Sequence, residues 1–260
     1  MLTTTRRSAG SILVLVCAFT ALLYASAWFL GADFRHDGGM PWAPVSAVGS
    51  EQGSDAPADT PPITCVVLDA GHGGEDGGAV SATGVVEKDV NLAVSFALRD
   101  LFEAAGIPVV MTRTEDTLLY DRNVDFQGRK KVLDLAARRL VAERTEGGLF
   151  ISIHMNAFPQ PQYHGMQVWY GVADPRSAAV AESIQAASAA LMPDNTRQIK
   201  AAGSNIYLLD RIRTPAVLVE CGFLSNPDEA ARLTDEAYQR SLAVAIFAAV
   251  APYVEPRAGE

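Results

Sequence analysis

Cysteine and positive charge are both scarce in this sequence. The 260 residues include three cysteines, Cys17, Cys65 and Cys221, with no CxxC spacing. An odd number of widely separated cysteines predicts no disulfide framework. The formal net charge is −9. We expect no nucleic-acid partner, because neutralising phosphates requires clustered Lys and Arg.

Compact motifs for metals and phosphates are also missing. The sequence has no HExxH pattern, and the glycine-rich stretch Gly71–Gly78 matches neither GxGxxG nor GxxxxGK[ST]. Its glycines are better explained as positions where the backbone closely approaches a metal or a substrate. A metal site in this chain must therefore be assembled from separated segments.

A long uncharged run occurs near the N-terminus, at Ser11–Leu30, and it follows Arg6 and Arg7. As a helix it would span ~30 Å, about one hydrocarbon core. The basic flank predicts that the short N-terminus stays in the cytoplasm. Residues 1–30 are then either an uncleaved membrane anchor or a signal peptide cleaved after Ala27. Both alternatives predict that the rest of the chain lies on the extracytoplasmic face of the membrane.

The composition changes after this segment. Residues 31–62 are rich in Gly, Pro, Ser, Ala and Asp, with few large apolar residues after Trp42. Such a stretch is typical of a flexible, weakly acidic linker. We expect one folded domain to follow, at 63–260, which is long enough to enclose a hydrophobic core.

The folded domain alternates short apolar runs with amphipathic stretches. The expected strands are Thr64–Ala70, Pro108–Thr112, Leu149–His154, Met166–Tyr170, Asn205–Leu209 and Ala216–Glu220. The expected helices are Glu87–Ala105, Gln127–Arg144, Asp174–Met192 and Asp235–Tyr253. This order predicts an α/β fold, a three-layer αβα domain with a mostly parallel sheet of about six strands.

Polar residues follow three of the expected strands. In open α/β sheets, sites gather at the carboxyl ends of the strands. His72, His154 and Glu220 lie at such ends, and Glu87 begins the helix after the glycine-rich loop. Two imidazoles and a carboxylate are a standard set for catalytic zinc, and a further carboxylate can accept a proton from water. Structural hydrogen bonds for the histidines, and a tight salt bridge for Glu220, remain open alternatives.

Five segments carry a resemblance to a known family. They are VVLDAGHGGEDGGAV, GVVEKDVNLAVSFAL, VVMTRTED, FISIHMNA and PAVLVECGFLSNPDEA. In this order they resemble the successive motifs of the zinc-dependent N-acetylmuramoyl-L-alanine amidases of the amidase-3 family, from about Ile63 to Val254. ISIHMNA and GMQVWY most resemble the spore-cortex branch, which trims stem peptides before muramic-δ-lactam is made.

The resemblance implies specific roles. His72, Glu87 and His154 match the zinc ligands of the family, for one Zn²⁺ per chain, and Glu220 matches its catalytic glutamate. The implied reaction is hydrolysis of the amide bond between N-acetylmuramic acid and L-alanine in peptidoglycan. Zinc lowers the pKa of a bound water and polarises the scissile carbonyl.

Three further residues are weaker candidates for the site. Asn91 lies one helical turn after Glu87, where it can orient that side chain, although a capping Asn is an alternative. Asn156 follows the His154 strand and either lines the cleft or forms a turn. Arg197, like Arg113, either meets a carboxylate of the peptide or forms a surface salt bridge.

Two other functions remain possible. One is an amidase for vegetative cell separation, and the other is a non-catalytic envelope protein that binds peptidoglycan. A degenerate binding protein would be free to lose the four central residues, and all four are present. The expected partners are peptidoglycan and the cytoplasmic membrane through the N-terminal segment, and an activator protein is a further candidate. The connection Ala157–Gly165 is too short to hold a long autoinhibitory helix.

Overall fold

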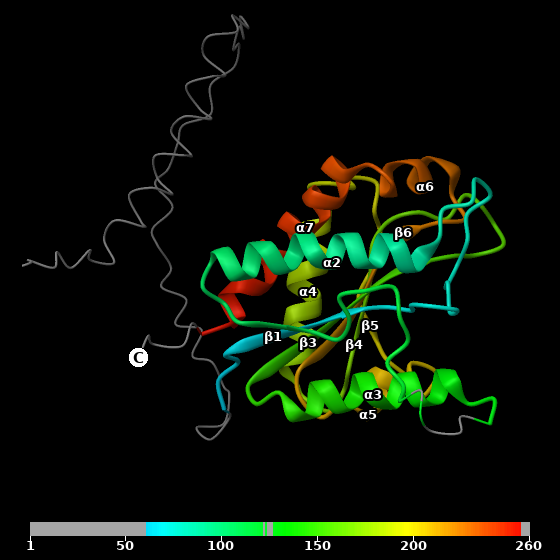
Figure 1. Ribbon diagram of the computed structural model, residues 1–260. Helices are drawn as coiled ribbons and strands as arrows, with labels where there is room; N and C mark the ends of the chain where they lie inside the picture. The colour runs from blue at the N-terminus through cyan, green and yellow to red at the C-terminus, as the bar shows by residue number, and fades with distance from the viewer. Residues whose placement is uncertain (1–60, 122, 124–126, 256–260) are drawn as a thin grey trace, which may run out of the picture. The chain divides into compact units, whose positions relative to one another are not determined.

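The computed structural model describes residues 61–121, 123 and 127–255 (Figure 1). The expected anchor or signal segment at 1–30, and all but the last two residues of the expected linker, lie outside this part of the chain. Among the described residues, no helix has the length and apolar character needed to cross a membrane.

A six-stranded sheet forms the centre of the domain, with the strand order β2-β1-β3-β6-β4-β5. The strands are β1 (Cys65–Ala70), β2 (Val109–Met111), β3 (Gly148–Asn156), β4 (Gln167–Tyr170), β5 (Lys200–Ala201) and β6 (Ala216–Phe223). Strand β4 runs antiparallel to β6, and the other pairs are parallel. The sheet is therefore mixed, with the predicted parallel part at its centre.

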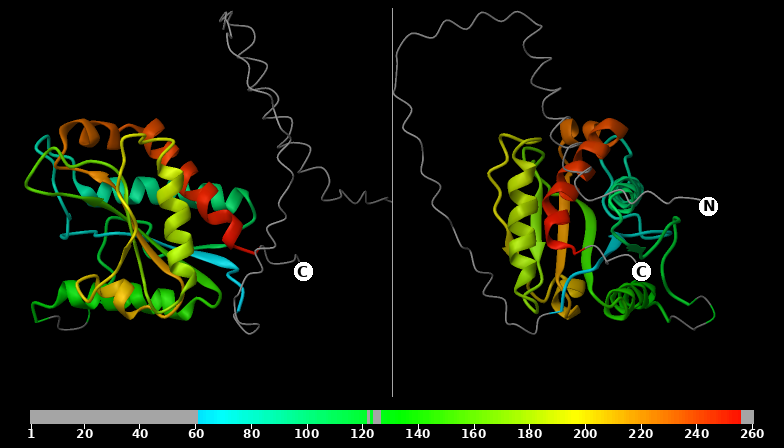
Figure 2. Two further views of the ribbon diagram at one scale, coloured as in Figure 1. Left: turned by 180° about the vertical axis from the view of Figure 1, so that it is seen from behind. Right: turned by 90° about the vertical axis from the view of Figure 1, so that its left-hand side faces the viewer.

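Helices cover both faces of this sheet (Figures 1 and 2). Helices α2, α4 and α7 pack together on one face, and α3 and α5 pack on the other. The helices are α2 (Glu87–Ala104), α3 (Lys130–Arg144), α4 (Arg176–Ser188), α5 (Tyr207–Arg211), α6 (Pro227–Leu233) and α7 (Glu236–Val250), and a 3₁₀ turn follows at Ala251–Tyr253. The predicted three-layer α/β architecture is confirmed.

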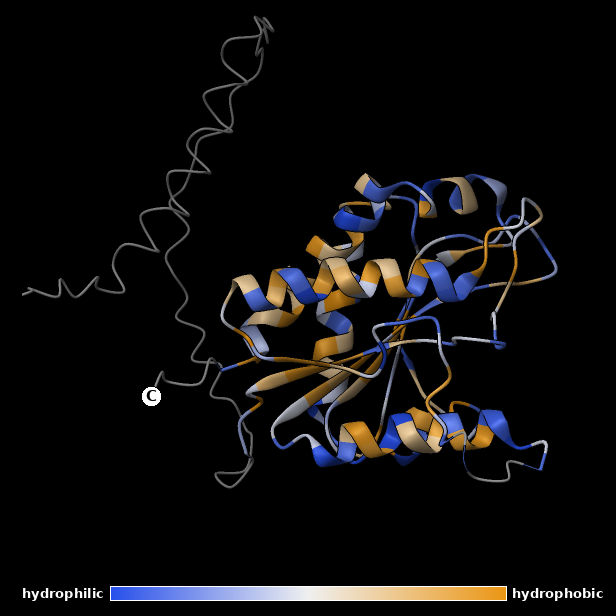
Figure 3. Ribbon diagram, in the orientation of Figure 1, coloured by the Kyte–Doolittle hydropathy of each residue, from blue (hydrophilic) through white to orange (hydrophobic). Residues whose placement is uncertain are grey.

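The hydrophobic core has two parts, one on each face of the sheet. Val66 and Leu68 of β1 belong to the core under α2, α4 and α7. Val67 of the same strand belongs to the core under α3 and α5. Successive side chains of a strand point to opposite faces, so a strand buried on both faces is a continuous apolar run. Figure 3 shows apolar residues along the central strands and alternating apolar and polar residues along the helices.

The prediction of a strand at Asn205–Leu209 is wrong. The chain forms the short helix α5 there, with Leu208 and Leu209 buried in the core under α3. A short apolar run fits a buried helix as well as a buried strand. The sixth strand is instead the two-residue β5. Helix α6 was not predicted; it begins after Asn226, whose side chain accepts hydrogen bonds from the backbone N–H groups of Asp228 and Glu229.

Candidate active site

His72 lies in the glycine-rich loop that follows β1. Its φ of 61° is in the left-handed region, which non-glycine residues adopt rarely. Two buried arginines fix this loop through its carbonyl oxygens. Arg138 donates to the carbonyl of His72 at 2.6 Å and to that of Ala70 at 2.8 Å. Arg113 donates to the carbonyls of Ala70 and Gly71 at 2.8 and 3.0 Å.

Glu87 is the first residue of α2, and its carboxylate is almost fully buried. Oε2 accepts a hydrogen bond from the backbone N–H of Ala79 at 2.7 Å, and Oε1 accepts one from that of Met155 at 3.1 Å. The Asn91 side chain is also buried and donates to Glu87 Oε1 at 3.4 Å and to the carbonyl of Gly71 at 3.1 Å. Asn91 therefore makes the contact with Glu87 that its spacing predicted.

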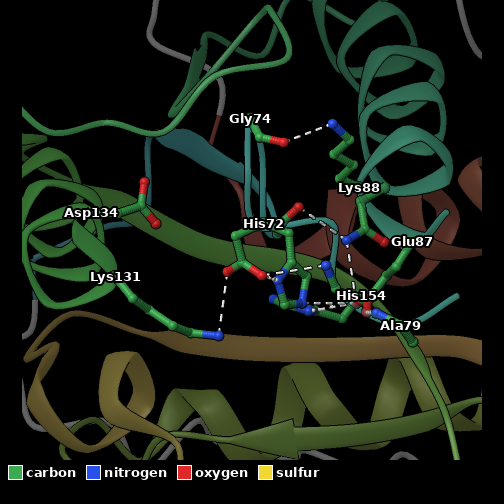
Figure 4. A network of polar contacts seen from close by, with 12 residues as sticks. His72, Gly74, Ala79, Glu87, Lys88, Lys131, Asp134 and His154 are labelled. Carbon is green, nitrogen blue, oxygen red and sulfur yellow. Dashed lines mark hydrogen bonds and ion pairs between the residues drawn. The ribbon is translucent and has the colours of Figure 1, made fainter. Parts of the chain in front are cut away.

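Three side chains converge near the carboxyl ends of β1 and β3: His72, Glu87 and His154 (Figure 4). Glu87 Oε1 lies 3.3 Å from His72 Nε2 and 2.9 Å from His154 Nδ1. The two imidazole rings meet edge to face, with centroids 4.9 Å apart. Among the described residues, this is the one group of three or more possible metal ligands, and its ligand atoms lie within 4.8 Å of one another. The group can hold a metal ion.

Two glycines make room for these side chains. A Cβ at Gly71 would lie 2.3 Å from the His154 ring, and a Cβ at Gly78 would lie 2.4 Å from Glu87 Oε2. Gly78 also has a φ of +70°, which favours glycine. The glycines of the loop thus permit a close approach of the backbone to the possible ligands, whereas the predicted approach to a metal or a substrate stays a prediction.

Asp76 contacts the ring nitrogen of His72 that does not face Glu87. Its Oδ1 lies 3.0 Å from His72 Nδ1, on the opposite side of the ring from Glu87. Burial lowers the pKa of His72, but Glu87 and Asp76 outweigh burial, and the net effect is a raised pKa. A carboxylate that binds the second nitrogen of a ligand histidine fixes its orientation. The sequence analysis did not identify Asp76, although it lies four residues after His72 in the same loop.

Glu220 lies next to the three converging side chains. It is the register partner of His154 on the adjacent strand β6. Its Oε2 atom is buried and has no hydrogen-bond partner among the described residues. Burial raises the pKa of Glu220 to about 7, where Glu87 also raises it and the two histidines oppose the shift. A carboxyl group with a pKa near neutrality can both accept and donate a proton.

A buried ionic network lies under the His72 loop, and the sequence analysis missed it. Asp69 accepts hydrogen bonds from Thr112 Oγ1 at 2.7 Å, Ser152 Oγ at 2.6 Å and Arg138 Nη1 at 2.7 Å. Arg138 also binds Asp134, one turn earlier on α3, at 2.8 Å. The spacing of Asp134 and Arg138 is visible in the sequence, but such a pair is usually exposed on a helix surface.

The remaining predicted residues are more widely distributed. Arg113 is buried, with 3% of its surface exposed, and it supports the His72 loop. Both expectations for this residue, a contact with a peptide carboxylate and a surface salt bridge, are therefore wrong. Asn156 and Arg197 both line a groove of about 390 Å³. His72 and His154 line a separate cleft of about 200 Å³. The segment 157–165 consists of turns and irregular backbone.

Comparison with known proteins agrees with this site. Residues 66–252 match the family described as N-acetylmuramoyl-L-alanine amidase. The germination-specific N-acetylmuramoyl-L-alanine amidase of Bacillus subtilis is 38% identical over 188 residues, which cover 72% of this chain and 78% of the relative.

Solved structures show the same fold. The CwlD amidase of Clostridioides difficile, determined in complex with the GerS lipoprotein, has a TM-score of 0.69 and 38% identity, covering 73% of this chain and 98% of that chain. The catalytic domain of CwlV from Bacillus (Paenibacillus) polymyxa var. colistinus has a TM-score of 0.63 and 30% identity, covering 74% and 98%. The chain therefore belongs to the N-acetylmuramoyl-L-alanine amidases, the peptidoglycan hydrolases whose motifs its sequence resembles.

Proposed function

We propose that this amidase works with one zinc ion, held by His72, Glu87 and His154, and with Glu220 as its general base. The observation that carries the proposal is the convergence of two imidazole nitrogens on one carboxylate oxygen, at 3.3 and 2.9 Å. Ligand atoms ~2.0–2.1 Å from a tetrahedral zinc ion would lie roughly 3.3 Å from one another. The donor set therefore suits zinc in both chemistry and spacing.

The surroundings of the three residues favour the same interpretation. A zinc ion in this position would supply a water of lowered pKa and would polarise the scissile carbonyl. Burial raises the pKa of Glu87, but hydrogen bonds with His154 and His72 outweigh burial and hold its pKa well below the usual range. The Glu87 carboxylate is therefore ionised, as a ligand must be.

Glu220 has the environment of a proton carrier. Its buried Oε2 has no hydrogen-bond partner among the described residues, so this oxygen is not committed to a structural contact there. In the proposed reaction it accepts a proton from the attacking water and then delivers it to the nitrogen of the departing L-alanine. The raised pKa of the carboxyl group, about 7, suits both transfers at neutral pH.

Metal analysis and product analysis test this proposal together. Protein purified without chelators should contain about one zinc per chain, as expected for a catalytic site of three protein ligands and one water. The variants His72→Ala and His154→Ala should lose both the metal and the activity. Digestion of purified peptidoglycan should release new L-alanine amino termini. Full zinc content in both variants would contradict the ligand assignment.

The biological setting that we propose is spore-cortex maturation. The supporting finding is the 38% identity with a germination-specific amidase. A strain that lacks this protein should then make cortex with less muramic-δ-lactam, and it should divide normally. Chains of unseparated vegetative cells with unchanged cortex would instead support the alternative role in cell separation.

The proposed location is the extracytoplasmic face of the membrane. Ser11–Leu30, which lies outside the described residues, would either anchor the domain or direct its secretion with cleavage after Ala27. Protease added to intact protoplasts should degrade the domain, and protection would contradict the topology. N-terminal sequencing of the mature protein would distinguish the anchor from the cleaved signal.

An activator is the last element of the proposal. One similar amidase was solved in complex with a lipoprotein, and we infer that this domain also works with an envelope protein. The purified chain alone should then have low activity even when it is loaded with zinc, and extract from the native membrane should increase that activity. Full activity of the chain alone would contradict this requirement.

A further inference from the structure

Three side chains form a row across the sheet. His154 of β3, Glu220 of β6 and Gln167 of β4 are register partners on adjacent strands. Residues in register on neighbouring strands have side chains on the same face, and each strand step is ~4.8 Å. The row therefore leads from the proposed zinc ligand, through the proposed base, to Gln167 about 10 Å away.

A groove of about 390 Å³ continues this row beyond Glu220. Gln167 forms part of its wall, together with the aromatic rings of Tyr163, Trp169 and Phe223. Trp169 is two residues after Gln167 on β4, so it shares the face of the sheet on which Glu220 lies. The groove is thus a lateral extension of the site and is distinct from the cleft beside His72.

Two cations lie over the aromatic rings of this groove. The guanidinium of Arg197 is 4.4 Å from the centre of the Phe223 ring and 5.9 Å from that of Tyr163. The ammonium of Lys200 is 5.2 Å from the centre of the Trp169 ring. Arg197 Nε donates to the carbonyl of His164 at 2.8 Å, which fixes the direction of the guanidinium.

Neither cation has an acidic partner within the part of the chain that the structure describes. The ion pairs found there involve other residues, although the chain as a whole has a net charge of −9. Two unpaired cations in one groove of an acidic protein indicate an anionic ligand. Arg197 Nη1 also donates to Gln167 Oε1 at 3.5 Å, and its Nη2 group still presents N–H groups for a carboxylate.

We propose that this groove binds the stem peptide through a free carboxylate beyond the scissile L-alanine, with Arg197 as the main contact and Lys200 as the second. The inference rests on the proposed function. In the substrate, the lactyl carboxyl group of muramic acid is the acyl half of the scissile amide, so the free carboxylates lie on the peptide side. The aromatic rings contact the apolar parts of the same peptide.

The length of the row indicates which peptide residue is bound. An extended peptide advances ~3.3 Å per residue, so a span of about 10 Å corresponds to two or three residues. The carboxylate that Arg197 contacts therefore belongs to the second or third residue of the stem peptide. Gln167 lies between this contact and Glu220, and its buried side chain supports the groove. Its Oε1 accepts from Arg197 Nη1 at 3.5 Å, and its Nε2 donates to the carbonyl of Gln198.

A pair of synthetic substrates tests the inference. Both are muramoyl peptides, and in one of them the free carboxylates of the second and third residues are replaced by carboxamides. Arg197→Gln should raise KM for the carboxylate substrate by about 10-fold or more, because charge-assisted hydrogen bonds are roughly twice as strong as neutral ones. It should change KM for the carboxamide substrate by less than about 3-fold. Lys200→Gln should also raise KM more for the carboxylate substrate than for the carboxamide substrate, but by a smaller factor than Arg197→Gln.

The matched control is Arg240→Gln, which removes an exposed positive charge from α7, where Arg240 pairs with Glu236. This variant should leave KM for both substrates unchanged. Calorimetric titration with the free stem peptide gives a second readout: the wild type should bind it more weakly as salt increases, and this salt dependence should be smaller in Arg197→Gln, where Lys200 is the remaining cation. If Arg197→Gln does not fold, as circular dichroism would show, Lys200→Gln carries the test.

The outcomes separate this inference from the proposed function. Cleavage of both substrates by the wild type, with equal losses on both in the groove variants, would overturn the peptide-carboxylate site and leave the amidase mechanism intact. A wild-type protein that is loaded with zinc and cleaves neither substrate would overturn the proposed mechanism itself. A selective loss on the carboxylate substrate supports both.

Discussion

His154 of β3 and Glu220 of β6 are register partners in adjacent parallel strands. Their side chains therefore lie side by side on one face of the sheet, at the spacing of neighbouring strands, ~4.8 Å. The two residues nevertheless differ in their contacts. His154 binds Glu87 at 2.9 Å, whereas the Oε2 atom of Glu220 has no partner among the described residues. This difference is the one that we expect if His154 is a ligand and Glu220 transfers a proton, as proposed.

The first prediction compares Glu220→Gln with Glu87→Gln. Both substitutions keep the size of the side chain and remove its negative charge. Glu220→Gln should lower the rate of stem-peptide release by ~10²–10⁴-fold, the usual contribution of a positioned acid–base group. Its zinc content should stay at the wild-type level. Glu87→Gln should lose zinc together with activity.

The measurements are elemental analysis and the count of new L-alanine amino termini in digested peptidoglycan. Equal loss of zinc in the two variants would make Glu220 a ligand and would overturn the assigned roles. A Glu220→Gln variant that keeps zinc and cleaves at the wild-type rate would show that another group is the base.

The second prediction concerns the space around the ligands and compares two glycines. Gly78 and Gly84 have φ values of +70° and +87°, so alanine is strained at both. A Cβ at Gly84 meets nothing within 4 Å, whereas one at Gly78 would lie 2.4 Å from Glu87 Oε2 and 2.7 Å from His72 Cδ2. Gly84→Ala should cost about 1–2 kcal/mol in the free energy of unfolding and keep zinc. Gly78→Ala should cost more and lose zinc.

Denaturant unfolding and zinc analysis of the two alanine variants provide the data. Equal zinc content in both would mean that the loop relaxes around the added methyl group, and the close approach at Gly78 would then have no role in the site.

The main elements of the fold could be predicted because their signals are local. Strands β1, β3 and β6 are continuous apolar runs, and α2 has apolar residues at helical spacing. Strand β5 has only two residues, both exposed, and exists because it pairs with β4. A segment whose conformation depends on a distant partner carries no such signal in its own sequence.

The same reasoning explains the site. His72, His154 and Glu220 could be identified because each follows or ends a predicted strand, and Glu87 because it begins a helix. The support provided by Arg138 could not be identified, since its burial depends on the loop and the strand that lie across from α3. Gln167 was also missed, because its proximity to Glu220 results from the antiparallel pairing of β4 with β6.

The third prediction concerns Arg138 as a positioning residue for His72. Arg138→Gln leaves two buried carboxylates, Asp69 and Asp134, without their cation, and should cost about 3–5 kcal/mol in the free energy of unfolding. Arg138→Lys keeps the charge but loses the planar fork that reaches the His72 carbonyl. It should fold and bind zinc about 10–100-fold more weakly.

Its control is Arg139→Gln, the next residue on α3, whose side chain is about one-third exposed and pairs with Glu143. Zinc affinity can be measured by competition with a chelating dye, which needs no enzymatic activity. Wild-type zinc affinity in Arg138→Lys would show that the His72 loop holds its conformation without this contact.

The last prediction concerns acid stability and follows from Asp69. Burial alone would raise the pKa of this carboxyl, but the charge of Arg138 and the hydrogen bonds from Ser152 and Thr112 outweigh burial and lower the pKa. The unfolded chain, with an ordinary Asp pKa of about 3.9, then binds more protons than the folded one. The stability that Asp69 contributes is thus fully present above about pH 4 and is lost as the pH falls through the lower, folded value.

Asp69→Asn removes this titration. The difference in the free energy of unfolding between metal-free wild type and Asp69→Asn should therefore be largest at neutral pH and should shrink as the pH falls below about 4. The exposed Asp100, changed to Asn, controls for the loss of one negative charge. Denaturant titrations at closely spaced pH values between about 3 and 7 provide the measurement, and a difference that stays constant over this range would show that Asp69 is not held ionised by Arg138.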